Sequence, residues 1–185
     1  QFEWDILDFF NKIGNGFFDV LFMLISEFGA GEIVFGMIVF IYYLYDKKLA
    51  KRILITLSTS LVFNGIFKSL FSAKRPFQFE GKEHLKALEN SSDGATGTSF
   101  PSGHSQNAGA FFTSIFMNFK KNWIKVLSII MLILVPISRL YLGVHFPGDV
   151  VVGLALGVII AIIMNIVYPK LENDLTYILF SCGMI

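Results

Sequence analysis

The stretch Ser138–Asp149, SRLYLGVHFPGD, lies between two long apolar runs and carries three ionisable residues close together. Arg139 is a permanent cation whose planar guanidinium group fits phosphate oxygens. His145 can act as a nucleophile or as a proton carrier near neutral pH. Asp149 follows four residues later, so its carboxylate can bond one imidazole nitrogen and leave the other nitrogen free to attack. The stretch therefore predicts half of a site for phosphoryl transfer.

The composition around this stretch is that of a membrane protein. Of the 185 residues, 54% are hydrophobic and 16% are charged, and 21 are Phe. Charged residues make up about a quarter of an ordinary soluble domain. The length predicts a single domain over residues 1–185. The net charge of +1 says little about partners, and because no basic tract suggests nucleic acid, no nucleic-acid partner is expected. The single Cys182 excludes an internal disulfide and a cysteine-based zinc site.

Apolar runs divide the rest of the chain into expected membrane helices. Five runs are read as spans, at 30–45, 53–71, 104–119, 124–138 and 150–168. The predicted fold is an all-α, polytopic membrane helix bundle of five to six transmembrane helices. We divide the domain into an N-terminal region of interfacial helices at 1–29, a catalytic helix core at 30–168, and a polar turn with the start of a further span at 169–185.

Small residues in two of these runs predict close helix–helix contacts. Ala108, Gly109 and Ala110 lie in the third run, and a second group lies in the fifth run, at Gly153, Ala155, Gly157 and Ala161. Small side chains let helix backbones approach closely within a membrane. We therefore expect each group to line a close contact with a neighbouring helix.

Basic residues give the expected orientation. Lys and Arg gather in the short connections at 47–52 and 120–125, which lie on one side of a five-span bundle. The positive-inside rule makes that side cytoplasmic. The segments at 1–29, 72–102 and 139–149 are then all expected on the opposite, non-cytoplasmic face.

The polar segment after the second run supplies candidates for the other half of the site. Lys68 and Arg75 are seven residues apart, which is two helical turns, so both can point to one side. Ser102, Gly103 and His104 stand where the third run begins. Backbone N–H groups at a helix N-terminus bind anions, and a glycine there lets the backbone approach a ligand closely.

Each of these residues also has an ordinary structural interpretation when taken alone. Lys68 could extend its charge to the membrane surface, and Arg75 could anchor a helix end there. His104 could be a polar residue at a helix terminus, and His84 is interpreted as a solvated surface residue. Three cations, two imidazoles and a carboxylate on one face of a membrane bundle favour a functional site, because ionisable groups near membrane depth are costly.

The three charged stretches together resemble a known family. They match, in order and with the family spacing, Lys68-x6-Arg75-Pro76, Pro101-Ser102-Gly103-His104 and Ser138-Arg139-x5-His145-x3-Asp149. This three-part motif is that of the type 2 phosphatidic acid phosphatase (PAP2) superfamily. The resemblance covers about 33–168 and departs at the amino end, where many bacterial members have another full span.

The resemblance implies a mechanism and a role for each motif residue. His145 attacks phosphorus and forms a phosphohistidine, Asp149 holds the imidazole tautomer, and His104 protonates the leaving oxygen and then activates water. Five residues would hold the phosphate oxygens: Lys68, Arg75, Ser102, Gly103 and Arg139. The three cations can serve in place of a metal ion, so neither a metal nor another cofactor is expected.

The expected partners are the lipid bilayer and a lipid phosphate. The resemblance implies an integral protein of a bacterial cell membrane, with its active site on the non-cytoplasmic face. Candidate substrates are undecaprenyl pyrophosphate, placed slightly first, phosphatidic acid, diacylglycerol pyrophosphate and phosphatidylglycerol phosphate. Two alternatives remain open: a lipid phosphotransferase that uses the same phosphohistidine, and a non-catalytic membrane protein.

Overall fold

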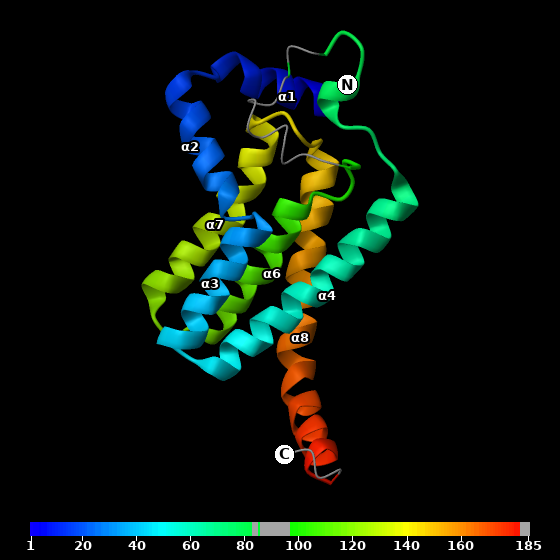
Figure 1. The fold of residues 1–185 in the computed structure, drawn as a ribbon. Helices are drawn as coiled ribbons and strands as arrows, with labels where there is room; N and C mark the ends of the chain where they lie inside the picture. The colour runs from blue at the N-terminus through cyan, green and yellow to red at the C-terminus, as the bar shows by residue number, and fades with distance from the viewer. Residues whose placement is uncertain (83–84, 86–96, 182–185) are drawn as a thin grey trace.

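The computed structural model describes residues 1–82, 85 and 97–181, and every regular element among them is helical (Figure 1). The elements are α1 (Phe2–Ile13), α2 (Gly16–Glu27), α3 (Gly31–Leu44), α4 (Lys47–Phe71), the 3₁₀ helix η1 (Pro76–Gln78), α6 (Gly103–Asn118), α7 (Asn122–Tyr141) and α8 (Pro147–Ser181). The predicted all-α fold class is confirmed.

The described helices differ in whether they are long enough to cross a membrane. Three segments are long and apolar enough, at Lys47–Gln78, Asn122–Tyr141 and Pro147–Lys170. The helices α2 and α3 together would form a fourth span, bent by 55° at the break between them. By length and composition the described helices therefore supply three or four spans, against the five or six that the sequence predicts. The difference arises because α3 and α6 have only 14 and 16 residues.

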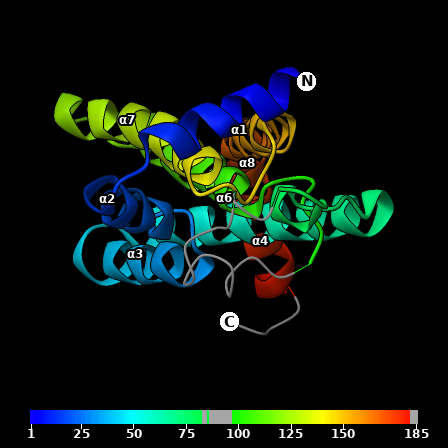
Figure 2. The ribbon, with the colours of Figure 1, turned by 90° about the horizontal axis from the view of Figure 1, so that it is seen from above.

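The N-terminal helices cover one end of the bundle. From above, α1 lies across the ends of α7 and α8, and it contacts both (Figure 2). Asn15 begins α2, and its side-chain oxygen accepts hydrogen bonds from the backbone N–H groups of Phe17 and Phe18 at 3.1 Å. This cap stabilises the start of α2 where no earlier turn can supply acceptors. The same end of the bundle holds the end of α7 and the starts of α6 and α8.

The central helix α6 packs closely against α8 along a seam of small residues. A Cβ atom added to Gly109 would lie 2.6 Å from the carbonyl oxygen of Leu154, and one added to Gly157 would overlap the carbonyl oxygen of Gln106. The close contacts predicted for the two groups of small residues are therefore present at these two glycines, and the structure shows that α6 and α8 are partners. Ala155 is exposed and does not belong to the seam, because residues 153, 157 and 161 share a helix face that residue 155 does not.

Buried amide groups join α4 to α6. The Asn64 side-chain amide donates to Gln106 Oε1 at 2.8 Å, and Gln106 Nε2 donates to the backbone oxygen of Ser60 at 2.7 Å. Buried polar groups are costly unless they are paired, and here the Gln106 amide is paired with both Asn64 and Ser60 of α4. These hydrogen bonds hold the first turns of α6 at a fixed height against α4.

The polar turn expected at 169–174 is not formed. Instead α8 continues through Pro169 to Ser181, and it extends beyond the other helices in Figure 1. A proline inside a helix removes one backbone hydrogen bond but does not prevent helix on both sides. The prediction of a turn at these residues is therefore wrong.

Candidate active site

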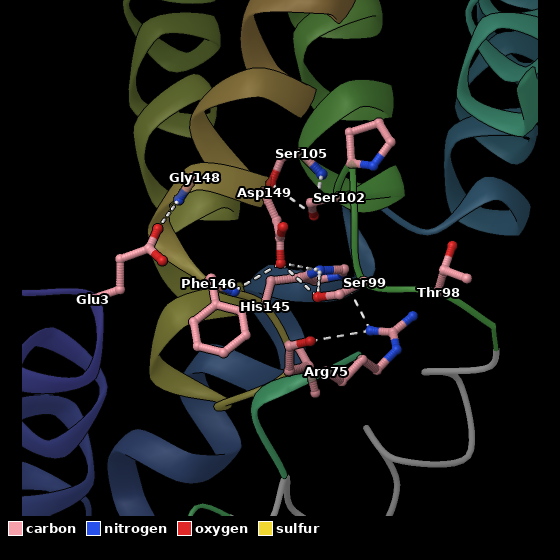
Figure 3. A network of polar contacts seen from close by, with 12 residues as sticks. Glu3, Arg75, Thr98, Ser99, Ser102, Ser105, His145, Phe146, Gly148 and Asp149 are labelled. Carbon is pink, nitrogen blue, oxygen red and sulfur yellow. Dashed lines mark hydrogen bonds and ion pairs between the residues drawn. The ribbon is translucent and has the colours of Figure 1, made fainter. Parts of the chain in front are cut away.

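Two cations from the end of α4 and the segment after it point into the loop that precedes α6. Lys68 Nζ donates to the backbone oxygen of Thr98 at 2.5 Å. Arg75 Nε donates to the backbone oxygen of Gly97 at 3.2 Å, and its Nη1 donates to the backbone oxygen of Val144 at 3.1 Å. The guanidinium group of Arg75 thus joins the loop before α6 to the loop before α8 (Figure 3).

His145 lies in the short connection between α7 and α8 and is almost fully buried, with 2% of its surface exposed. Its Nε2 atom is 3.3 Å from Arg75 Nη1, and its Nδ1 atom is 3.3 Å from Ser99 Oγ. Burial is the largest cause that lowers the pKa of His145 from its ordinary value, and the Asp149 carboxylate acts in the opposite direction. The imidazole is therefore neutral near pH 7, which is the form required of a nucleophile.

Asp149 stands in the first turn of α8 and faces His145. Its Oδ2 atom accepts hydrogen bonds from the backbone N–H of Phe146 at 2.9 Å and from the Ser99 hydroxyl at 2.5 Å. Oδ2 is 3.6 Å from His145 Nδ1, which is longer than a hydrogen bond. The direct carboxylate–imidazole bond predicted from the four-residue spacing is therefore not made in this structure.

Ser102 caps the N-terminus of α6. Its backbone N–H donates to the backbone oxygen of Asp149 at 3.0 Å, so it is not available to a phosphate, contrary to the prediction. Its Oγ atom accepts from the N–H and the hydroxyl of Ser105 at 3.4 Å and 3.0 Å. A hydroxyl has two acceptor sites and one hydrogen, so the hydrogen of Ser102 remains to donate. Gly103 follows as the first residue of α6, where N–H groups lack helical acceptors.

Arg139, near the C-terminal end of α7, is 3% exposed. Its Nη1 atom donates to the hydroxyl of Ser26 in α2. Its Nε atom is buried and has no hydrogen-bond partner within the described part of the chain. A buried donor without a partner costs free energy, and a phosphate oxygen would satisfy it.

His104, the second residue of α6, is half-buried beside these groups. It lies within electrostatic range of four predicted site residues: Lys68, Arg75, Arg139 and His145. The structure therefore brings the predicted imidazoles, cations and carboxylate to one end of the bundle, where the ends of four helices meet.

The donor set favours an anion over a metal ion. Within residues 1–82, 85 and 97–170, no three His, Cys, Asp or Glu side chains are grouped so that they could hold a metal. Two guanidinium groups, those of Arg75 and Arg139, act instead on His145, and fixed cations of this kind attract phosphate. His84 lies outside the described residues.

Two residues in contact with the site were not predicted from the sequence. Ser26 contacts Arg139, which lies 113 residues later in the sequence, and no local sequence pattern predicts such a contact. Ser99 lies in the loop just before the stretch Pro101-Ser102-Gly103-His104. Its closeness to that motif was the only sequence feature that could have suggested a role in the site. In addition, Glu3 of α1 accepts a hydrogen bond from the backbone N–H of Gly148 at 2.9 Å (Figure 3), so α1 also contacts this end of the bundle.

Comparison with known proteins agrees with this geometry. The chain is 32% identical over 111 residues to an undecaprenyl-diphosphatase of Sulfolobus acidocaldarius, which covers 60% of this chain and 51% of that protein. It is 30% identical over 149 residues to phosphatidylglycerophosphatase B of Bacillus subtilis, which covers 74% of this chain and 68% of that protein. The crystal structure of Aquifex aeolicus LpxE is similar with a TM-score of 0.74 at 26% identity, covering 87% of this chain and 93% of that one.

The chain spans about half the length of the Sulfolobus relative. The family model described as the PAP2 superfamily matches residues 48–172, which include every motif residue discussed above. That match extends over well more than half of the sequence, and we conclude that the chain belongs to the PAP2 superfamily.

Proposed function

We propose that this chain is a membrane phosphatase that hydrolyses a lipid phosphate or pyrophosphate through a phosphohistidine on His145. The observation that carries the proposal is a buried, neutral imidazole whose Nε2 atom faces a guanidinium group, 3.3 Å from Arg75 Nη1. A neutral imidazole beside fixed cations is suited to attack a phosphorus atom whose oxygens those cations hold.

The proposed reaction has two steps. In the first, the lone pair of His145 Nε2 forms a bond to phosphorus and the bond from phosphorus to the leaving oxygen breaks. His104, whose protonated form the negative charge of the bound phosphate favours, gives that oxygen its proton. In the second, His104 takes a proton from water, the water oxygen attacks phosphorus, and the N–P bond breaks to regenerate His145 and release inorganic phosphate. Arg75 must exchange its contact with Nε2 for a phosphate oxygen before attack.

Five residues are proposed to hold the phosphate oxygens: Lys68, Arg75, Ser102, Gly103 and Arg139. The unpartnered Nε of Arg139 and the hydroxyl hydrogen of Ser102 support this assignment. Donors that are fixed before the substrate arrives stabilise the charge of the transition state without reorganising. The three cations would supply the charge that Mg²⁺ supplies in many phosphoryl-transfer enzymes.

We infer that the substrate is an isoprenyl pyrophosphate such as undecaprenyl pyrophosphate, with glycerophospholipid phosphates next. The Sulfolobus relative is named an undecaprenyl-diphosphatase and the Bacillus relative a phosphatidylglycerophosphatase, and a phosphate site at the end of membrane helices suits both kinds of lipid. The basic connections at 47–52 and 120–125 lie at the opposite ends of their helices from the site. This arrangement supports a site on the non-cytoplasmic face, in a single domain over 1–185 with 30–168 as its catalytic core.

The experiment that tests this function is phosphate release by the detergent-purified protein in the presence of EDTA. The lipids to compare are undecaprenyl pyrophosphate, phosphatidic acid and phosphatidylglycerol phosphate, with His145→Ala as the inactive control. We expect release from at least one lipid to be unchanged by EDTA and to vanish in the variant. Release from no lipid, or equal release by the variant, would contradict the proposal, and transfer of phosphate to a lipid acceptor would identify a phosphotransferase.

The guanidinium group of Arg75 gives a second test. Arg75→Lys is expected to lower kcat/KM by about a hundredfold, because one ammonium group cannot replace the three contacts that the planar group makes. The matched control is Lys74→Gln, which removes an adjacent, exposed cation. Steady-state phosphate release measures both variants, and similar losses in the two would show that only the general charge of this segment matters.

A further inference from the structure

Ser99 lies between the two residues that the family motif pairs. Its Oγ atom is 3.3 Å from His145 Nδ1 and 2.5 Å from Asp149 Oδ2, whereas Nδ1 and Oδ2 are 3.6 Å apart. The side chain is fully buried, with 0% of its surface exposed. Figure 3 shows the hydroxyl beside both partners.

The hydrogen positions in this group follow from what each partner can do. Arg75 Nη1 only donates hydrogen bonds, so the Nε2 atom 3.3 Å away acts as the acceptor. A neutral imidazole that accepts at Nε2 carries its hydrogen on Nδ1, and that N–H points to Ser99 Oγ. Asp149 Oδ2 only accepts, so the single hydroxyl hydrogen of Ser99 goes to Asp149. The chain of donors therefore runs from His145 through Ser99 to Asp149.

We propose that Ser99 is a positioning residue whose hydroxyl connects Asp149 to His145 and holds the imidazole in the tautomer that leaves Nε2 free to attack phosphorus. The effect on rate rests on the proposed phosphatase function, whereas the effect on the tautomer does not. Asp149 thus reaches the imidazole through this hydroxyl as well as across the longer direct separation of 3.6 Å.

The backbone at Ser99 is held independently of its side chain. The Ser99 N–H donates to the backbone oxygen of Ala73 at 2.8 Å, and the neighbouring loop is held by Arg75 and Lys68. Replacing Ser99 with alanine therefore removes the hydroxyl and leaves the phosphate-binding residues in place. This separation makes the proposal testable by kinetics.

The kinetic test compares Ser99→Ala with two other variants. We expect Ser99→Ala to lower kcat by about tenfold to a hundredfold with KM unchanged within about twofold, because loss of an orienting partner affects attack more than binding. Ser99→Thr keeps the hydroxyl and is expected to recover most of kcat. Ser114→Ala is the matched control, since Ser114 is equally buried in α6 but bonds only its own helix, at 2.8 Å to the Ala110 oxygen.

A second readout follows the tautomer directly and needs no turnover. The chain has three histidines, so the nitrogen NMR spectrum of histidine-labelled protein is simple, and His84→Gln removes one signal for assignment. We expect His145 to carry its hydrogen on Nδ1 in the wild type and to populate the Nε2–H form in Ser99→Ala.

Two results would overturn the proposal: a kcat equal to that of the wild type in Ser99→Ala, or an unchanged Nδ1–H tautomer in that variant. These measurements also distinguish failure of the proposed phosphatase function from failure of the proposed role of Ser99. Absence of phosphate release by the wild type, together with a tautomer change in Ser99→Ala, would reject the phosphatase function and retain the positioning role of Ser99.

Discussion

Replacing His145 with alanine is expected to lower phosphate release by at least about a thousandfold, because the variant has no group that can accept the phosphoryl group. The surrounding cations would still bind the substrate, so KM should change far less than kcat. Alanine leaves a gap next to Arg75 and Ser99, and the buried contacts at 3.3 Å to both residues are lost. A thermal melt of the purified variant would show whether the fold persists.

The intermediate itself can be trapped by changing the other histidine. In His104→Ala the second step is slow because no base activates water, so a radiolabelled substrate with a good leaving group should leave label on the protein. The label should be released by acid and resist base, as expected for a phosphorus–nitrogen bond. It should be absent from the double variant His104→Ala/His145→Ala, and His84→Ala should behave as the wild type. Label that persists in the double variant would place the phosphoryl group on another residue.

Replacing Gly157 with alanine is expected to destabilise the protein by about 3 kcal/mol, which corresponds to a fall in Tm of about 6–12 °C. The added methyl group would overlap the carbonyl oxygen of Gln106 and lie 2.8 Å from the backbone nitrogen of Ala110. Both contacts are to backbone atoms, which cannot rotate away as a side chain can. The helices α6 and α8 would have to separate, and His104 is carried by the first turn of α6.

Gly65→Ala provides the matched control for this substitution. Gly65 also lies inside a helix, α4, but in the described part of the chain no heavy atom beyond its adjacent residues and its own helix backbone stands within 4 Å of the position that its Cβ would occupy. Alanine stabilises a helix by about 0.5–1 kcal/mol relative to glycine, so this variant should melt at the same temperature or slightly higher. Thermal unfolding in one detergent compares the two variants. Equal changes in Tm would show that the α6–α8 seam is not closely packed.

The sequence predicts those parts of the fold and site that depend on local pattern. The apolar runs located the helices, and the motif placed its charged residues at helix ends, because both signals are read within a few residues. The bridge between His145 and Asp149 was missed because it depends on Ser99, which comes from another loop. Likewise, the contact of Arg139 with Ser26 depends on the bend between α2 and α3. Ala155 was misassigned because composition alone does not define a helix face.

The length of α8 places its last residues far from the site at which the helix begins. Its 35 residues, at about 1.5 Å each, form a rod of roughly 50 Å, whereas the hydrocarbon layer of a bilayer is about 30 Å thick. Since the rod begins at Pro147, beside the site, and is longer than the hydrocarbon layer, we expect its last turns to lie beyond that layer on the far side of the membrane. A purification tag, a fluorophore or a surface linker attached there would stay clear of the lipid headgroups at the site. Protein attached to a surface through the end of α8 would then keep its site accessible to lipid substrate.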